Sequence, residues 1–249
     1  MDDIKKLVPA FIKKPFKKIY SYILFLLDYD NFKEKNNSRF PLEWKNIQPE
    51  LEDKTTSTSF DTHYIYHPAW AARVIAEIKP KKHIDISSIL CFSTLISAFI
   101  PTEFYDYRPA NIKLDNYHTG KGDLTFLPFT DNSVESISCM HTIEHIGLGR
   151  YGDQMDPSGD IKAIEELKRV VRKNGNIIFV VPVGKSKLMF NAHRIYSYEQ
   201  ILSYFNGFEL KEFSLIPDDA KKTGIIKNAS KELVDKQNYG CGCFWFIKK

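Results

Sequence analysis

The sequence has few cysteines, and this shortage excludes a class of protein. Four cysteines, Cys91, Cys139, Cys241 and Cys243, are too few for a disulfide framework in 249 residues, so a disulfide-rich secreted domain is excluded. Cys91 and Cys139 lie in apolar segments typical of a core, and Cys241-x-Cys243 lacks the second pair that would complete a four-cysteine zinc site. We therefore expect structural cysteines, a reducing cytoplasmic location and no metal ion.

The chain also lacks a large excess of positive or negative charge, and it has no long apolar run. The chain has 35 Lys and Arg against 31 Asp and Glu, a net charge of +4. A nucleic-acid surface needs a clustered basic excess, so no nucleic-acid partner is expected. The apolar stretch 19–27 is far shorter than the roughly 20 residues that span a bilayer, and no small-residue cleavage site follows it. We expect neither a membrane span nor a secretory signal.

What the chain does contain is enough apolar sequence for one domain with an N-terminal extension. Hydrophobic residues make up 43% and aromatic residues 14% of the sequence. Within residues 1–32, apolar side chains alternate with lysines at helical spacing. Such a basic amphipathic helix can pack on the domain, pack on a second subunit of a homodimer, or lie on an anionic membrane surface. A polar linker or lid follows, and the boundaries predicted are 1–60 for the extension and 61–249 for the domain.

Strands and helices alternate in the second part of the chain. Short apolar runs predict strands at 83–87, 103–107, 134–140, 177–181, 208–216 and 242–247. Helical spacing predicts helices at 68–78, opened by Pro68, and at 89–100 and 157–173. This alternation predicts an α/β fold with a parallel sheet and helices on both faces.

In such sheets, ligands bind beyond the carboxyl ends of the strands. That rule gathers polar residues from several predicted strand ends: Asp85, Ser87, Asp106, Arg108, Asp123, His141, Glu144, His145, Asn191, His193 and Arg194. An acidic residue after the second strand, here Asp106, is the usual partner of ribose hydroxyls. Taken singly, Asp85 can cap a helix, Asp106 can be a surface carboxylate and a histidine can simply be packed. Their convergence on one edge of one sheet favours a ligand site.

Two segments carry a family resemblance. Residues 122–145 contain an acidic residue, Leu-Pro-Phe, a strand and Glu-His, and residues 164–175 end a helix with Glu-x-x-Arg-Val-Val-x-x-Asn-Gly. Over residues 68–249 the chain resembles the class I S-adenosylmethionine (SAM)-dependent methyltransferases. The resemblance implies a Rossmann-like three-layer sandwich with a mostly parallel seven-stranded sheet and a C-terminal antiparallel strand. It also implies SAM as cofactor.

The resemblance assigns cofactor contacts to particular residues. Asp85 and Ser87 belong to the first SAM motif, Asp106 with Arg108 follows the second strand at the ribose, Asp123 and Leu124 flank the adenine, and His141 lies near the methionine end. The family's first motif is Asp-x-Gly-x-Gly, whereas residues 85–89 read Asp-Ile-Ser-Ser-Ile. A methyltransferase-like binding module that has lost SAM therefore stays open as an alternative. A Rossmann dehydrogenase is excluded because Gly-x-Gly-x-x-Gly is absent.

A narrower resemblance concerns the acceptor. Residues 147–153, Gly-Leu-Gly-Arg-Tyr-Gly-Asp, and residues 190–196, Phe-Asn-Ala-His-Arg-Ile-Tyr, resemble a poorly characterised branch of that fold. Its members occur in bacterial surface-polysaccharide settings and in some animals. This implies O-methylation of a sugar, nucleotide-sugar or phosphorylated glycan.

Transfer of a methyl group to a hydroxyl needs a base, and histidine suits neutral pH. The candidates are His145 and His193. Arg150 and Arg194 suit an anionic acceptor because guanidinium binds phosphate or carboxylate in a bidentate way. The substrate-binding set predicted is Arg150, Tyr151, Asp153, Asn191 and Arg194. The alternative for residues 147–153 is a structural loop held by an Arg150–Asp153 pair.

Overall fold

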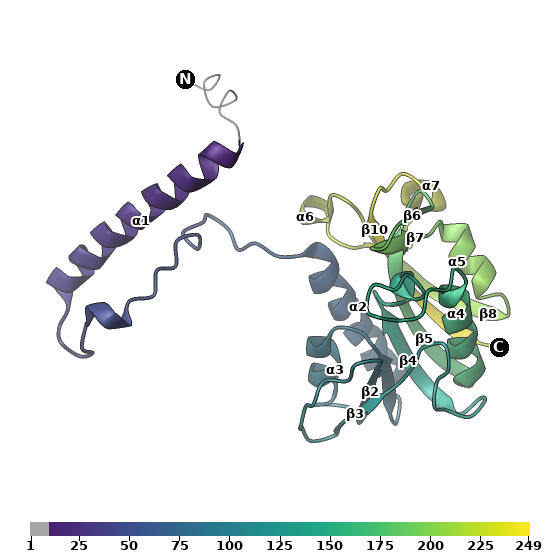
Figure 1. Ribbon diagram of the computed structural model, residues 1–249. Coiled ribbons are helices and arrows are strands. Elements are labelled where there is room, and N and C mark those ends of the chain that lie inside the picture. Colours follow the sequence, from purple (N-terminus) through teal and green to yellow (C-terminus); the bar gives the residue numbers. More distant parts are fainter. Residues whose placement is uncertain (1–9) are drawn as a thin grey trace. The chain divides into compact units, whose positions relative to one another are not determined.

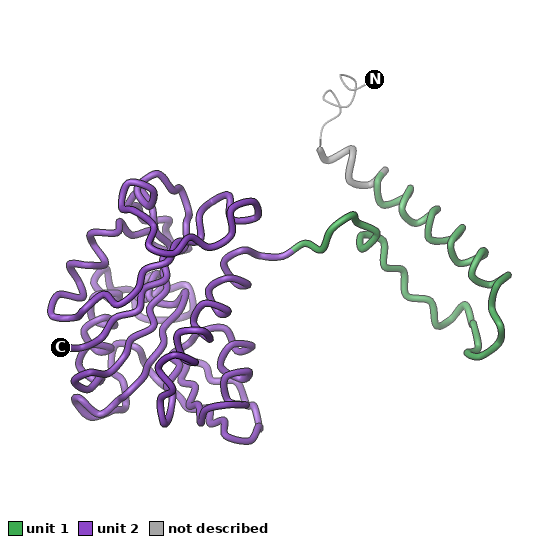
Figure 2. Tube along the Cα trace, turned by 180° about the vertical axis from the view of Figure 1, so that it is seen from behind, with its two compact units in different colours: residues 1–59 green, residues 60–249 purple. Residues whose placement is uncertain are grey.

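The computed structural model describes residues 10–249, with side chains from residue 17 onward. The chain forms two compact units, residues 1–59 and residues 60–249 (Figure 2).

The first unit contains one long helix and an irregular segment. Helix α1 (Ala10–Lys35) is followed by a single turn, η2 (Trp44–Asn46). The Tyr29 ring packs edge-on against Trp44 at 5.4 Å between centroids. Much of the apolar surface of α1 is uncovered: Ile19, Leu27 and Phe32 are each about 60% exposed. No helix among the described residues has the length and apolar character needed to cross a bilayer, and residues 1–9 of the predicted amphipathic helix lie outside the described part.

The second unit is built on an eight-stranded sheet in the order β3-β2-β1-β4-β5-β10-β8-β9 (Figure 1). The strands are β1 (His83–Ile86), β2 (Thr102–Asp106), β3 (Tyr117–Lys121), β4 (Val134–Met140), β5 (Val171–Val183), β8 (Phe208–Ile216), β9 (Ile226–Lys227) and β10 (Gly240–Lys248). Strands β1 to β5 are parallel, and β10 is antiparallel to both of its neighbours. The Rossmann-like methyltransferase sandwich is confirmed, with the short edge strand β9 as an eighth member.

Helices cover both faces of this sheet. One face carries α2 (Thr62–Ile78) and α3 (Leu90–Ile96), and the other carries α4 (Gly159–Val170) and α5 (Tyr198–Tyr204). Strand β5 shows the reason, because successive side chains point to opposite faces. Phe179 and Val181 join the core under α4 and α5, whereas Ile178 and Val180 join the core under α2 and α3. Smaller elements are η3 (Ile143–His145), β6 (Lys187–Met189), β7 (His193–Ile195), α6 (Ala220–Thr223) and α7 (Lys231–Val234).

Several elements differ from the prediction in their bounds, and some were not predicted. Helix α2 begins at Thr62, where the Asp61 side chain accepts a hydrogen bond from the Tyr64 amide, so Pro68 lies inside the helix. Helix α4 ends at Val170 because the chain joins the sheet at Val171, opposite Val134. Strand β3 and the β6–β7 hairpin were not predicted, since their sequences are short and largely polar.

Candidate functional site

A cleft of about 490 Å³ lies along the carboxyl ends of β1, β2 and β4. That volume falls in the usual range of small-molecule sites, about 300–1,000 Å³. Six of the seven residues assigned to the cofactor line it: Ser87, Asp106, Arg108, Asp123, Leu124 and His141. Of the predicted catalytic and substrate-binding residues, His145, Tyr151 and Asp153 line it as well.

Two carboxylates, Asp106 and Asp123, face the cleft from the ends of β2 and β3. Asp106 Oδ1 accepts a hydrogen bond from the Arg108 amide at 2.7 Å. Asp123 Oδ1 accepts hydrogen bonds from the Thr125 amide and hydroxyl at 2.8 and 2.7 Å. Each set of bonds uses one carboxylate oxygen and fixes the side chain, so the second oxygen remains for a ligand's hydroxyl or amino group.

Ser87 takes the place of the first glycine of the motif and adopts the left-handed conformation, with φ 54°. Its amide donates to Tyr105 O at 2.8 Å, and its carbonyl accepts from the Thr142 hydroxyl at 2.9 Å. These bonds hold a conformation that costs a non-glycine residue about 1 kcal/mol. Ile89, two residues on, does not line the cleft and packs against the core under α2 and α3. The glycine-free loop therefore keeps its bulky side chains out of the site.

Asp85 was expected at the end of the first strand, in the ligand site, and this expectation is wrong. It lies within β1, is fully buried, and accepts a hydrogen bond from the Ser138 hydroxyl. Burial raises the pKa of Asp85 to about 7. Since it does not line the cleft, its contact is with the sheet interior.

Two histidines follow β4, and their neighbours set their tautomers. His141 Nδ1 lies 2.8 Å from Glu144 Oε1, and His145 Nδ1 lies 2.6 Å from Ala192 O. Both acceptors require a proton on Nδ1, and in a neutral ring this leaves Nε2 as a lone-pair acceptor. Burial lowers the pKa of His145, so its ring is neutral at pH 7 and can accept a proton.

The loop 147–153 is held by Asp153, and the Arg150–Asp153 pair of the structural alternative is not formed. The Asp153 carboxylate accepts backbone hydrogen bonds from Gly147 at 2.8 Å, Gly149 at 3.4 Å and Tyr151 at 3.2 Å. Arg150 donates instead to the Ala192 carbonyl at 3.0 Å. Burial raises the pKa of Asp153, but these backbone bonds outweigh it and the net shift is downward.

Two arginines lie over the Tyr151 ring, and of the two only Arg108 lines the cleft. The guanidinium carbons of Arg108 and Arg150 lie 4.9 and 5.0 Å from the centre of the Tyr151 ring. The Tyr151 ring is 40% exposed, and the two cations gathered there suit an anionic group in the cleft.

Arg194, predicted as a second acceptor-binding arginine, is used within the fold instead. It donates to Ile146 O at 2.7 Å and Pro157 O at 3.3 Å, and its Nε lies 3.5 Å from the Asp160 carboxylate. It lines a second cleft of about 400 Å³ beside α4 and α5. His193 and Asn191 do not line either cleft, and the His193 ring packs 4.9 Å from Tyr239.

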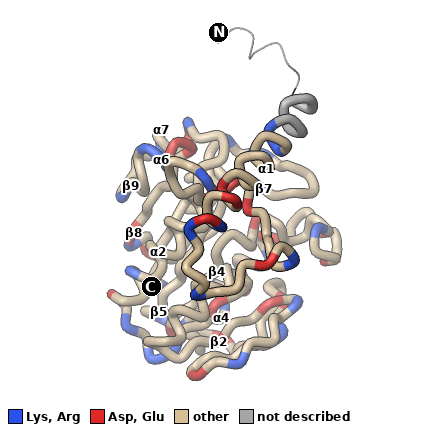
Figure 3. Tube along the Cα trace, turned by 90° about the vertical axis from the view of Figure 1, so that its left-hand side faces the viewer, with Lys and Arg blue, Asp and Glu red and all other residues tan. Residues whose placement is uncertain are grey.

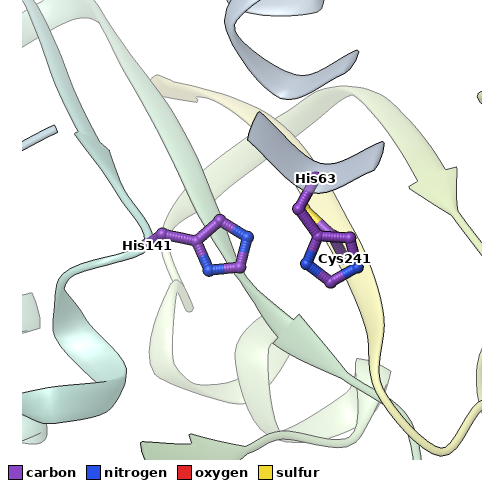
Figure 4. Close-up of side chains that lie close together, drawn as sticks. All are labelled: His63, His141 and Cys241. Atoms are coloured by element: carbon purple, nitrogen blue, oxygen red, sulfur yellow. The ribbon is translucent and has the colours of Figure 1, made fainter. Parts of the chain in front are cut away.

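Sequence reasoning missed the residues that surround His141. His63 and His67, both on α2, have ring centroids 5.2 Å from that of His141, and Cys241 of β10 completes the group (Figure 4). The one available signal was the His-x-x-x-His spacing of the two α2 histidines. Both lie before Pro68, where the predicted helix begins.

Comparison with known proteins supports the fold. The family described as "Caenorhabditis protein of unknown function, DUF268" matches residues 128–239, under half of the chain. No curated protein matches the sequence.

Solved structures match over most of the second unit. The YcgJ protein of Bacillus subtilis is 16% identical, with a TM-score of 0.51 over 74% of this chain and 98% of that chain. A protein of Galdieria sulphuraria described as a sarcosine dimethylglycine methyltransferase is 12% identical, with a TM-score of 0.52 over 73% of this chain and 84% of that chain. The fold is that of the class I SAM-dependent methyltransferases.

A third structure has a ligand in it. The 1,6-didemethyltoxoflavin-N1-methyltransferase of Burkholderia thailandensis contains S-adenosylhomocysteine. It is 9% identical, with a TM-score of 0.52 over 74% of this chain and 78% of that chain. At these identities the likeness concerns the fold, and the chemistry of this chain has to be argued from its own cleft.

Proposed function

We propose that the protein is a SAM-dependent methyltransferase. The observation that carries the proposal is the cleft at the carboxyl ends of β1, β2 and β4, with a fixed carboxylate after β2 and a second after β3. When bound, SAM supplies an activated methyl group. Asp106 would accept hydrogen bonds from the ribose hydroxyls, Asp123 and Leu124 would hold the adenine, and Ser87 and His141 would lie beside the methionine end.

His145 is the residue we propose as the base. Its Nδ1 donates to Ala192 O, and its ring lines the cleft. Nε2 would therefore take the proton of an acceptor hydroxyl, whose oxygen would bond to the methyl carbon as the carbon–sulfur bond breaks and S-adenosylhomocysteine leaves. Because methyl transfer is an in-line displacement, the remaining task of the protein is positioning. His193, outside the cleft lining and packed on Tyr239, is the weaker candidate.

We propose an anionic sugar, nucleotide-sugar or phosphorylated glycan of surface-polysaccharide biosynthesis as the acceptor. Arg108, which lines the cleft, and Arg150, which lies with it within about 5 Å of the centre of the Tyr151 ring, favour a phosphate or carboxylate near that ring. Basic and acidic positions are interspersed along the chain (Figure 3), which favours a small molecule over a nucleic acid.

For helix α1 we keep two proposals, a peripheral membrane contact or a contact with a second copy of the chain. The exposed apolar side chains of α1, such as Ile19, Ile23 and Leu27, would be covered in either case.

The decisive experiment titrates SAM and S-adenosylhomocysteine into the protein by calorimetry. We expect binding by the natural chain and an affinity about 10- to 100-fold lower in Asp106→Asn, because a charge-assisted hydrogen bond contributes about 1.5–3 kcal/mol. Asp115→Asn, an exposed carboxylate on the loop between β2 and β3, is the matched control and should bind as the natural chain does. If SAM does not bind even at millimolar concentration, the binding-module alternative replaces the enzyme.

The base assignment is tested with methyl transfer to a fractionated extract of nucleotide-sugars. His145→Ala should lower kcat about 10²- to 10⁴-fold, the usual contribution of a general base, while SAM affinity changes little. Full turnover in His145→Ala would remove the assignment.

A further inference from the structure

A buried group of three metal-ligating side chains lies beside the cleft. His63 comes from the first turn of α2, His141 from the residue after β4, and Cys241 from β10. One ligand atom from each residue lies within 4.8 Å of the other two, and all three residues are buried. Figure 4 shows the His141 and His63 rings side by side, with Cys241 behind the His63 ring in this view.

The hydrogen bonding of His141 leaves one of its two ring nitrogens without a partner. Its Nδ1 is bonded to Glu144 Oε1 at 2.8 Å, while its Nε2 is buried and has no hydrogen-bond partner. A histidine that donates Nδ1–H to a carboxylate and presents a free Nε2 lone pair has the arrangement of a metal ligand with its orienting carboxylate. A buried nitrogen without a partner otherwise costs about 1–3 kcal/mol.

The donor set selects the kind of ion. Two imidazole nitrogens and one thiolate suit Zn²⁺ and similar first-row ions, whereas Mg²⁺ and Ca²⁺ require oxygen ligands. We propose that His63, His141 and Cys241 bind one divalent ion of the Zn²⁺ class, with the Cys241 thiol releasing its proton to solvent as the ion binds.

Binding of an ion would draw the three ligand atoms closer together. Ligand atoms in a tetrahedral zinc site lie about 3.5 Å apart, whereas those of His63, His141 and Cys241 lie within 4.8 Å of one another. Three protein ligands leave a fourth position open, as in zinc sites that bind water or a substrate oxygen. Because His141 also lines the cleft, an oxygen of a molecule bound there would be the natural fourth ligand.

A metal-free interpretation competes with this one. The His63 ring stacks between His141 and Tyr239, at 5.2 and 5.1 Å between centroids, and such a stack contributes packing energy of its own. It does not give Nε2 of His141 a partner. The two interpretations therefore differ in whether the natural chain takes up a metal ion.

Cobalt(II) titration of the full chain, stripped with a chelator and without SAM, tests the proposal. We expect one Co²⁺ per chain, a thiolate-to-cobalt charge-transfer band in the near ultraviolet, and loss of the band when Zn²⁺ is added. Mg²⁺ should not displace the cobalt. Absence of stoichiometric binding by the natural chain would overturn the proposal.

Variants identify the ligands. Cys241→Ser should abolish the charge-transfer band, and Cys243→Ser should keep it, because Cys243 is equally buried on the same strand but lies outside the ligand group. An unchanged band in Cys241→Ser would overturn the proposal. If that variant does not fold, His63→Gln on the first turn of α2 takes its place, with an expected loss of at least about tenfold in Co²⁺ affinity. None of these readouts requires SAM, so failure of the metal site and failure of the proposed methyl transfer are distinguishable.

Discussion

At the scale of single residues, the most unusual feature is a polar chain inside the sheet. His83 Nδ1 lies 2.8 Å from the Ser136 hydroxyl, and its Nε2 lies 2.9 Å from the Ser138 hydroxyl, which in turn donates to Asp85. All hydrogens are placed if Ser136 donates to Nδ1 and Nε2–H donates to Ser138. Every bond then points toward the Asp85 carboxyl, whose second oxygen, Oδ2, has no hydrogen-bond partner.

Asp85 and His83, at the two ends of this row of hydrogen bonds, change the stability of the protein with pH in opposite directions. Burial raises the pKa of Asp85 to about 7, so its contribution to stability is present in acid and is lost as the pH rises from about 4 to 7. Burial lowers the pKa of His83 to about 3, so its contribution is present above pH 6.5 and is lost as the pH falls. Between pH 4 and 6.5, the loss of stability from Asp85 and the gain from His83 with rising pH should largely cancel.

Single substitutions should separate the pH dependence that Asp85 gives to the free energy of unfolding from the one that His83 gives. Relative to that of the natural chain, the free energy of unfolding of Asp85→Asn should increase as the pH rises from about 4 to 7, by roughly 1 kcal/mol per pH unit, because only the natural chain loses stability there. Relative to the natural chain, His83→Gln should show the reverse trend over pH 4 to 6.5. Urea unfolding at half-unit pH steps measures both. Parallel curves for the three proteins would contradict the assigned shifts.

At the scale of elements, the loop 147–157 depends on one close approach of backbone to backbone. Gly147 has φ +78°, and a Cβ there would lie 2.0 Å from the carbonyl oxygen of Asp156. Gly152 has φ +83° with nothing within 4 Å. The two glycines therefore share a conformation and differ in the space around them.

This difference predicts unequal costs for the same substitution. Gly147→Ala should destabilise the protein by about 2–4 kcal/mol, since a backbone atom must move, whereas Gly152→Ala should cost about 1 kcal/mol for the conformation alone. Thermal or urea unfolding of the two variants provides the comparison. Equal losses would mean that the loop moves freely to accept the methyl group.

Local pattern predicted most of the fold because the strands of the sheet are short segments rich in apolar residues, either continuous, as in β5, or interrupted by single polar residues, as in β4. Val134–Met140 and Phe208–Ile216 have the predicted bounds. The start of α2 was missed because Asp61 begins a helix that continues through Pro68, and proline is usually read as a first-turn residue.

The site was predictable only in part, for a related reason. Asp106 and Asp123 follow strands, so the sheet rule places them at its carboxyl edge. Arg194 and Asp153 form hydrogen bonds with backbone carbonyls and amides. The positions of these backbone groups cannot be predicted from the identity of the two side chains. The group formed by His63, His141 and Cys241 joins three elements far apart in the chain, and no local spacing reports it.

At the scale of the whole molecule, each of the two cores lies entirely within residues 60–249. Among the side chains described, from residue 17 onward, every buried core residue, from Trp70 to Phe246, belongs to that unit. The unit therefore holds the apolar contacts that stabilise the fold.

Removal of residues 1–59 should leave this unit folded. The free energy of unfolding of residues 60–249 should match that of the full chain within about 0.5 kcal/mol, as expected for independent parts. Sedimentation with anionic phospholipid vesicles should retain the full chain and not the truncated one if α1 contacts a membrane. Concentration-dependent self-association of the full chain without vesicle binding would favour the second-copy proposal instead.

The position of β10 also orders events during synthesis. Strand β8 leaves the ribosome before β10, yet β10 lies between β8 and β5. Until the nascent chain reaches Gly240, β5 has an open edge and β8 has no place beside it, which is a stage exposed to wrong pairing. The half of the sheet that bears the Asp106 cleft can form first, and Cys241 arrives with the strand that closes the gap. Any ion held by that cysteine would thus be acquired after translation of the sheet is complete.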